Sequence, residues 1–315
     1  MNKDGLILHL CVVADTHIDI LHPDPERPKR HLFNAIKDSR SAQPPMDAFI
    51  IVGDTTSRSS EINWEMTEEV FKKAGRPAKR TLIAIGNHDT WCDEEDKTAI
   101  ERYLRHTCNI TGEKHEKTYF STIINGCHLI FLGAEDDNGC EAYISDEQAE
   151  WFRDEMASAG ESRLPVLVFC HQSLNGKHGL PRTFSCDESD TGEMDGGIGE
   201  KSGFIEAVMK EHKNVFFFSG HSHMGFGGDK CFAENGYSSF ERYGDMTLIN
   251  LPSLACGNHH GEIKEFGLGL EIEVYPDRLI MRPRSFDEGR YLDEFAVQGN
   301  SSCYTVRFTE TEGVI

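Results

Sequence analysis

The 315-residue chain lacks the long apolar stretch that a membrane-spanning helix requires. Such a helix needs about 20 consecutive apolar residues, and no run in this sequence approaches that length. Basic residues are in deficit, with 32 lysines and arginines against 53 aspartates and glutamates, for a formal net charge of −21. Because so acidic a surface repels polyanions over long distances, we expect no nucleic-acid polymer and no membrane as partner. Small phosphorylated substrates remain compatible with this charge, since bound cations reverse the local field.

The ten cysteines contain no C-x-x-C pair, which excludes the spacing of a zinc ribbon or a redox dithiol. Cys11 and Cys170 lie in apolar runs, where a free cysteine behaves as a small hydrophobic residue. Reduced cysteines favour a cytoplasmic protein. The apolar run 5–14 superficially resembles a signal peptide, but it leads directly into Asp15 and has the character of a strand that the fold needs. We therefore expect no signal peptide.

Short apolar runs alternate with amphipathic segments in the first half of the chain. Residues 6–13, 48–52 and 82–85 are near-continuous apolar runs, typical of strands that are buried on both faces. Residues 29–39 and 61–73 have the periodicity of amphipathic helices. This β-α-β-α-β order predicts a mostly parallel sheet with helical crossovers.

The second half predicts a hairpin, another helix and more strands. The hairpin spans 118–132 and turns at Asn125-Gly126, and a helix begins after a capping box formed by Ser145 and Gln148. Four further strands are predicted at 166–170, 215–218, 270–274 and 279–282.

No internal repeat or linker divides the chain, so we expect a single domain over residues 1–315, with two sheets packed between helices. The chemistry-bearing motifs lie within 6–260, and the strands within 266–310 are expected to complete the second sheet. No heptad or apolar surface stripe specifies an oligomeric state.

Two irregular stretches, 172–202 and 224–244, have the length of functional loops or of disordered segments, and the sequence does not specify whether they act as lids. The acidic part of the first, 187–195, is expected to be solvated or to fold over a substrate. His259 and His260 are expected to lie in a solvated turn.

Five polar clusters each follow directly after an apolar run. They are Asp15-Thr16-His17, Gly53-Asp54, Gly86-Asn87-His88-Asp89, the single His171, and Gly220-His221-Ser222-His223. In open α/β sheets, ligands bind at the carboxyl ends of the strands, so the five clusters are expected to converge on one edge. The members of the pairs Asp15/His17 and His221/His223 are two residues apart, and an extended backbone directs both side chains of each pair to one face.

Carboxylate, imidazole and amide oxygen together suit Mn, Fe or Zn rather than Ca. Taken singly, each cluster has a structural explanation: Gly53-Asp54 could form a simple turn, and His171 could be a hydrogen-bonded histidine at a strand end. Their shared position at strand ends favours a metal site. A carboxylate such as Asp54 can bridge two ions, which two-metal hydrolytic sites hold ~3.5–4 Å apart.

The order of the clusters resembles the calcineurin-like metallophosphoesterase superfamily, whose pattern runs D-x-H, G-D, G-N-H-[DE], H and G-H-x-H. The resemblance implies an α/β fold that is a four-layer α/β/β/α sandwich, two mixed sheets flanked by helices, with the metal site at the strand C-terminal ends. It implies one metal ion held by Asp15, His17, Asp54 and His223, and a second held by Asp54, Asn87, His171 and His221. His88 matches the family's non-ligand histidine, which contacts the phosphate or protonates the leaving oxygen.

One departure from the family pattern argues against the phosphoprotein-phosphatase branch of the superfamily. The phosphoprotein-phosphatase branch carries G-D-x-x-D-R-G, whereas here Ser57 replaces the second Asp and no Gly follows Arg58. His88 then lacks that branch's carboxylate partner, which disfavours a protein phosphatase. The segments 145–151 and 250–253 are loosely similar to the cyclic-nucleotide phosphodiesterase-like branch.

The expected activity is hydrolysis of small, cyclic-nucleotide-like phosphodiesters. Two bound cations would lower the pKa of a shared water, and the resulting hydroxide would attack phosphorus in line. His88 would protonate the leaving oxygen, while Asp89 would orient His88 or a ligand, or serve only as a turn carboxylate. Two alternatives stay open: a nucleotide or sugar-phosphate phosphomonoesterase or pyrophosphohydrolase, and a noncatalytic protein-binding scaffold.

Overall fold

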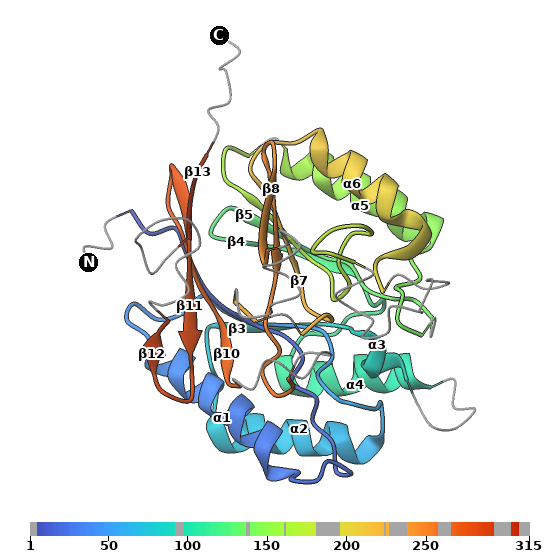
Figure 1. The fold of residues 1–315 in the computed structure, drawn as a ribbon, viewed down its shortest axis with the longest axis vertical. Coiled ribbons are helices and arrows are strands. Elements are labelled where there is room, and N and C mark those ends of the chain that lie inside the picture. The colour runs from blue at the N-terminus through green and yellow to red at the C-terminus, as the bar shows by residue number, and fades with distance from the viewer. Residues whose placement is uncertain are drawn as a thin grey trace.

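Two sheets lie between two layers of helices (Figure 1), as expected for the four-layer α/β/β/α sandwich. The computed structural model describes residues 5–91, 98–136, 139–160, 162–180, 196–223, 225–226, 238–257, 266–292 and 304–308. Within these ranges no helix is long and apolar enough to span a bilayer.

The first sheet has the strand order β12-β11-β10-β1-β2-β3, with β13 paired to β11. Its strands are β1 (Leu8–Val13), β2 (Ala48–Val52), β3 (Arg80–Ala84), β10 (Leu268–Val274), β11 (Arg278–Ser285), β12 (Arg290–Tyr291) and β13 (Tyr304–Arg307). The neighbours β1, β2 and β3 are parallel, whereas β10 to β13 are antiparallel to their neighbours. The sheet is therefore mixed.

The second sheet has the order β4-β5-β6-β7-β9-β8 and is also mixed. Its strands are β4 (Phe120–Ile124), β5 (Cys127–Phe131), β6 (Val166–Phe169), β7 (Val215–Ser219), β8 (Phe240–Tyr243) and β9 (Met246–Asn250). The hairpin β4–β5 turns at the predicted residues, and both Asn125 and Gly126 have positive φ angles. The parallel trio β5, β6 and β7 directs its carboxyl ends toward the same edge.

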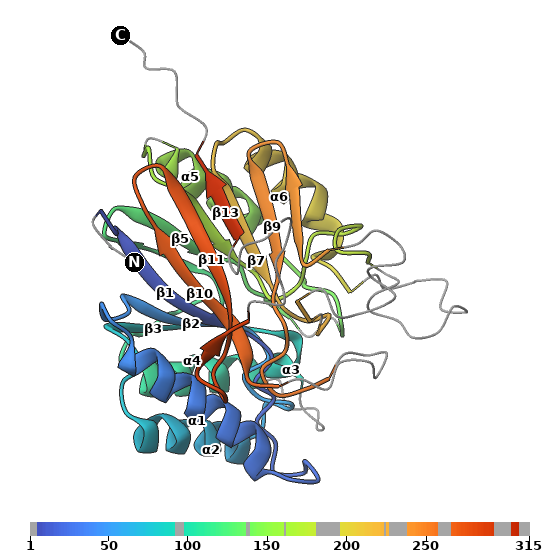
Figure 2. The same ribbon diagram turned by 60° about the vertical axis from the view of Figure 1, so that its left-hand side comes forward.

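The strands near the C-terminus do not complete the second sheet, and that expectation is wrong. β10 pairs antiparallel with β1, with Leu10 opposite Ile272, so these strands extend the first sheet instead. The alternation in β10 specifies a strand with one face toward the inter-sheet core, but it does not specify the neighbouring strand. Figure 2 shows β10 and β11 beside β1.

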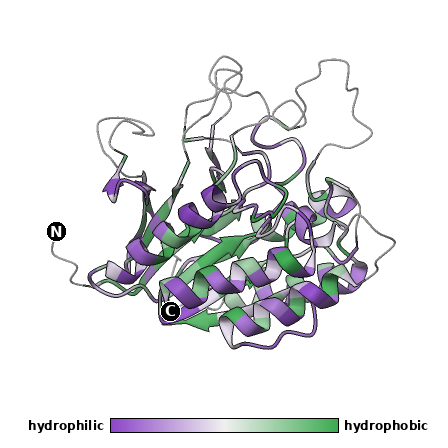
Figure 3. Cartoon of the chain, turned by 90° about the horizontal axis from the view of Figure 1, so that it is seen from below, coloured by the Kyte–Doolittle hydropathy of each residue, from purple (hydrophilic) through white to green (hydrophobic). Residues whose placement is uncertain are grey.

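Helices α1 (Glu26–Ser41), α2 (Glu61–Ala74) and α4 (Ala99–Thr111) cover the first sheet, and α5 (Asp146–Ala159) and α6 (Ser202–Lys210) cover the second (Figures 1 and 2). Two short helical turns lie between them, α3 (Asn87–Thr90) and the 3-10 turn η1 (Gly199–Lys201). Figure 3 shows apolar strands lying between helices whose surfaces alternate between polar and apolar.

Alternate residues of the strands form three packed layers. Leu10 and Phe218 belong to the core between the sheets, whereas Val13 packs toward α1 and α2, and Phe217 toward α5 and α6. Strands with apolar residues on both faces are the reason for the continuous apolar runs in the sequence.

The predicted capping box at α5 is half present. Ser145 Oγ accepts from the backbone N of Gln148 at 3.2 Å, but the Gln148 side chain hydrogen-bonds both backbone groups of Gly133 instead of returning to Ser145. The backbone N of Ser145 donates to Glu135, which leaves Gln148 available to fix the end of β5.

The two stretches predicted to be irregular include residues that form regular structure. Residues 199–202 form η1 and the start of α6, and 240–243 form β8, an edge strand paired with β9. The acidic stretch 187–195 and the pair His259 and His260 lie outside the described residues.

Candidate metal centre

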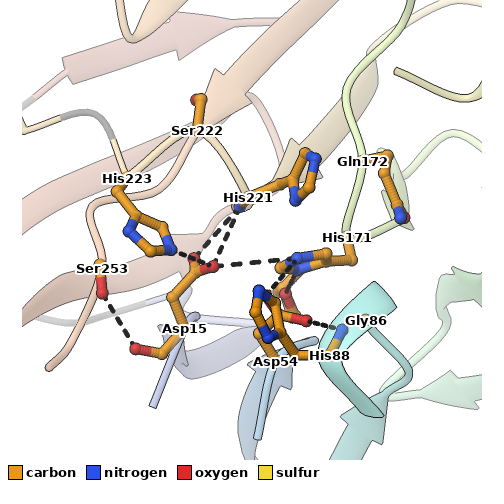
Figure 4. A network of polar contacts seen from close by, with 12 residues as sticks. Asp15, Asp54, Gly86, His88, His171, Gln172, His221, Ser222, His223 and Ser253 are labelled. Atoms are coloured by element: carbon orange, nitrogen blue, oxygen red, sulfur yellow. Dashed lines mark hydrogen bonds and ion pairs between the residues drawn. The ribbon is translucent and has the colours of Figure 1, made fainter. Parts of the chain in front are cut away.

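The seven predicted ligands follow strands of both sheets. Asp15, His17, Asp54 and Asn87 follow β1, β2 and β3, while His171, His221 and His223 follow β6 and β7. Figure 4 shows Asp15 and Asp54 from the first sheet facing the histidines of the second. The sheets thus supply the two sides of one polar centre.

The side chains form two groups that share Asp54. Ligand atoms of Asp15, His17, Asp54 and His223 all lie within 4.8 Å of one another, and so do those of Asp54, His171 and His221. Apart from the Asn87 amide, these are the two ligand sets that the resemblance implies. A shared carboxylate is the arrangement that lets one residue contact two ions.

Distances within the centre are short. His223 Nε2 lies 3.2 Å from Asp15 Oδ1, and His171 Nε2 lies 3.1 Å from Asp54 Oδ2. His17 Nε2 and His223 Nε2 are 3.0 Å apart, a hydrogen-bond distance at which one ring nitrogen donates to the other. The Nε2 atoms therefore converge on a common point.

Backbone carbonyls set the tautomer of two of these histidines. His171 Nδ1 donates to the carbonyl of Val52 at 2.8 Å, and His223 Nδ1 donates to that of Gly257 at 3.1 Å. Because a carbonyl only accepts, each Nδ1 carries a proton and each Nε2 is the nitrogen presented to the centre. Metal-bound histidines in proteins are held in the same way.

Five of the predicted ligands have left-handed backbone conformations, which non-glycine residues rarely adopt. Their φ angles are 56° for Asp15, 44° for His17, 50° for Asp54, 70° for His221 and 52° for His223. Each such residue costs on the order of 1–3 kcal/mol, and such strain gathers at functional sites. The left-handed conformation turns the chain sharply after each strand, so that the side chain projects into the centre.

Glycines of the motifs make room for ligands from other motifs. A Cβ on Gly86 would lie 2.2 Å from Oδ1 of Asp54, and one on Gly220 would lie 2.5 Å from Oδ2 of Asp15. Neither clash could be relieved without displacing the carboxylate. The recurrence of glycine before these ligands therefore has a steric cause.

The donor set fits bound cations. Among the described residues, Asn87 Oδ1 is buried without a hydrogen-bond partner, and a buried polar atom left unsatisfied costs about 1–3 kcal/mol. Asp54 Oδ2 and His171 Nε2 are also buried, and they lie 3.1 Å apart with no further hydrogen bond. Metal ions coordinated by these atoms would satisfy all three.

Burial and the neighbouring carboxylates have opposite effects on the pKa values of the histidines in the centre. Burial disfavours the charged form of His171, but Asp54 and Asp15 outweigh burial and raise its pKa to about 9. At His17 burial prevails and lowers the pKa to about 3. In the metal-free protein a proton on His171 therefore partly takes the place of a cation.

Comparison of the sequence with models of protein families identifies the family of this chain. The model for calcineurin-like phosphoesterases matches residues 8–225. The chain belongs to the calcineurin-like phosphoesterase family. No curated protein sequence matches the chain.

Solved structures share this phosphoesterase fold at low identity. A dimetal phosphatase from Danio rerio is 10% identical with a TM-score of 0.60, covering 96% of this chain and 100% of that one. Purple acid phosphatase PPD1 from yellow lupin is 11% identical with a TM-score of 0.62, covering 95% and 53%. GAP50, the anchor in the inner membrane complex of Plasmodium, is 10% identical with a TM-score of 0.52, covering 98% and 90%. At such identities the likeness shows the fold alone.

His88, which matches the non-ligand histidine of the phosphoesterase family, has a backbone partner in place of a carboxylate. Its Nδ1 donates to the carbonyl of Ser57 at 2.8 Å, and its backbone N donates to Asp54 Oδ1 at 2.9 Å. Its Nε2 lies 4.0 Å from Asp54 Oδ2, on the side of the centre, and 29% of the side chain is exposed (Figure 4). The backbone of Ser57 thus supplies the acceptor for His88 Nδ1.

Asp89 joins two ligand loops and makes no described contact with His88. Its carboxylate accepts from the backbone N–H groups of Thr55, Thr56 and Gly86. Burial and the charge of Asp54 raise its pKa to about 6 despite these donors. These hydrogen bonds hold the loop that carries Asp54 against the turn that carries Asn87.

Two supporting residues lie at and after the end of β9. Ser253 Oγ donates to the carbonyl of Asp15 at 3.0 Å, and Asn250 Nδ2, from the last residue of β9, donates to the carbonyl of Gly220 at 2.8 Å. Asn250 Oδ1 also accepts from Ser222 at 2.7 Å. In the sequence these residues stood out only as a loose family likeness; a buried strand that ends in Asn250, with Ser253 shortly after it, was the available signal.

A third group, His9, Glu271 and Glu273, lies on the helix-facing side of the first sheet. His9 contacts Glu271 at 3.1 Å and the carbonyl of Pro44 at 3.0 Å, and Arg282 donates to Glu273 at 3.0 Å. Because these side chains satisfy one another, the group is a structural network.

Proposed function

We propose that the protein is a two-metal hydrolase of phosphate esters. The observation that carries the proposal is the pair of ligand groups sharing Asp54, beside the buried Asn87 Oδ1 that lacks a hydrogen bond. The ions would be Mn, Fe or Zn, held by Asp15, His17, Asp54, Asn87, His171, His221 and His223. The contribution of both sheets to this site supports a single domain over residues 1–315.

Bound metal ions would activate water and neutralise charge on the phosphate oxygens. Hydrogen bonds within the chain orient the side chains that would hold these ions. Asp54 is held by the backbone N of His88 through Oδ1, which leaves Oδ2 facing both ligand groups. The carbonyls of Val52 and Gly257 keep His171 and His223 oriented with Nε2 inward.

His88 is the proposed acid for the leaving group. Since Nδ1–H is committed to the carbonyl of Ser57, the proton that His88 would transfer is one carried by Nε2, which faces the centre. Its transfer to the departing ester oxygen leaves a neutral ring whose remaining N–H still donates to Ser57.

The proposed substrates are small phosphodiesters of the cyclic-nucleotide kind. Support comes from the surface charge, which disfavours polyanionic chains, and from the absence of the protein-phosphatase carboxylate beside His88. A phosphomonoesterase or pyrophosphohydrolase acting on nucleotide or sugar phosphates is the alternative within the same chemistry. We place the protein in the cytoplasm because its cysteines fit a reducing environment.

The test compares hydrolysis of bis(p-nitrophenyl) phosphate and p-nitrophenyl phosphate with Mn, Fe or Zn added, or with chelator. Wild type is measured beside Asp54→Ala, His88→Ala and the control Ile123→Ala, an exposed residue of the β4–β5 hairpin. We expect metal-dependent diester turnover, abolished in Asp54→Ala, strongly reduced in His88→Ala and unchanged in the control. Preference for the monoester would indicate a phosphatase. No turnover with any metal would contradict the proposal and favour a noncatalytic scaffold.

A further inference from the structure

A row of aromatic rings leads from the metal centre to the surface. The rings of His223 and His17 lie 5.0 Å apart, those of His17 and His88 4.9 Å, and those of His88 and Trp91 5.4 Å. Exposure rises along the row, from 5% for His17, through 29% for the His88 side chain, to 44% for Trp91. Trp91 therefore lies one ring beyond the residue that faces the leaving group.

The backbone of Trp91 is fixed although its side chain is exposed. Its N–H donates to the carbonyl of Asn87 at 3.1 Å, and its carbonyl accepts from Ser59 at 2.8 Å. The backbone from which the indole projects is thus attached to the turn that carries Asn87 and His88, and the ring itself packs edge-on against His88. Single exposed apolar residues are ordinary on protein surfaces, but this one lies beside a proposed catalytic histidine and contacts it.

The cationic side chain of Arg58 lies beside the Trp91 ring. Its guanidinium lies 5.8 Å from the centroid of the Trp91 ring, within the range of a cation–π contact. Arg58 directly follows Ser57, whose carbonyl accepts from His88 Nδ1, so Arg58, His88 and Trp91 are neighbours in the structure. An indole and a guanidinium together present flat surfaces that favour planar aromatic groups rich in acceptor atoms.

We propose that Trp91, with Arg58, forms a leaving-group subsite that stacks a planar aromatic ring of the substrate, such as a nucleobase. The inference rests on the proposed phosphoesterase function, because it is the position of His88 that defines the leaving-group side. The substrates are phosphate esters whose alcohol carries the ring, and aliphatic esters of equal size bind less tightly.

The test measures binding of three phosphonates to the Mn-loaded full chain by titration calorimetry. Their C–P bond is not an ester and survives the enzyme. Benzylphosphonate and cyclohexylmethylphosphonate match in size and differ in aromaticity, and methylphosphonate reports on the phosphate site alone. We expect wild type to bind the benzyl compound about fivefold or more tightly than the cyclohexylmethyl compound, the lower end of what base–aromatic stacking contributes.

Variants then assign the preference to Trp91. In Trp91→Ala the ratio of the two affinities is expected to fall to about one, in Trp91→Phe to persist, and in the exposed control Ile123→Ala to match wild type. A structural role would lower all affinities together and leave the ratio unchanged, which overturns the inference. Equal affinities in wild type, with methylphosphonate still bound, overturn it while leaving the proposed function intact. If no phosphonate binds, both fail.

Discussion

At the scale of single residues, the centre is a set of side chains whose protonation depends on whether cations are bound. His171 has its pKa raised to about 9 because Asp54 and Asp15 outweigh the effect of burial. Its Nδ1 is committed to the carbonyl of Val52, so the proton that a cation must displace is the one on Nε2. Metal binding and proton binding compete for the same atom.

We therefore expect metal loading to release protons at neutral pH. Below pH 9 the metal-free His171 is protonated, so the apparent affinity for Mn or Zn should rise as pH increases toward about 9, while His17, with its pKa lowered to about 3, contributes no proton. Titration calorimetry at pH 7.5 in buffers of different ionisation enthalpy measures the number released. A heat of binding that is the same in all buffers would contradict this expectation.

The candidate ligands could be selected from the sequence, but much of what holds them could not. Asp15, Asp54 and His171 stand out because each is the second residue after a buried strand. The partner of His88 is a backbone carbonyl, and Asp89 accepts from backbone N–H groups. Contacts with the backbone leave no pattern in the side-chain sequence, so the sequence could propose a role for Asp89 but not select among roles.

At the scale of elements, the turns after the strands have little room, and glycine is the only residue that fits some of them. We expect Gly86→Ala to displace Asp54, because the added Cβ would lie 2.2 Å from its Oδ1. Metal content, measured after dialysis against chelator-free buffer, should fall by about one ion or more per chain, and phosphodiester turnover should fall with it.

Gly203→Ala is the matched control, because a Cβ at Gly203 in α6 meets nothing within 4 Å. Alanine is favoured over glycine inside helices by roughly 0.5–1 kcal/mol, so this variant should keep its metal and be slightly more stable. Equal metal content in the two alanine variants would show that the approach of Asp54 to Gly86 is not what fixes the ligand.

Elements with an uninterrupted apolar pattern, whether strands or amphipathic helices, could be predicted, whereas α4, α6 and β8 could not. β2 begins and ends at the predicted residues, since every residue of it is apolar and buried. α4 escaped prediction because its buried positions include His106 and Thr107, which break the apolar periodicity. β8 is an edge strand whose outer residues are polar or exposed, and α6 is short and follows a glycine-rich loop.

At the scale of the whole molecule, the proposed ions join two sheets. The first sheet supplies Asp15, His17, Asp54 and Asn87, and the second supplies His171, His221 and His223. Without cations, the strained turns and the buried acceptor atoms lose the interaction that offsets their cost. The metal-free protein should therefore be weakest where the carboxyl ends of the sheets meet.

Removal of metal should lower the stability of the entire fold, because a ligand that binds only the folded state stabilises it by mass action. At a free metal concentration of about 100 times Kd the gain is roughly 2.7 kcal/mol, which corresponds to about 4 °C in Tm for a chain of 315 residues. Differential scanning calorimetry with chelator, and after Mn or Zn is restored, measures the shift. Asp54→Ala removes the shared ligand, so its Tm should respond little to chelator. If wild type and Asp54→Ala respond equally, the ions do not join the sheets through this carboxylate.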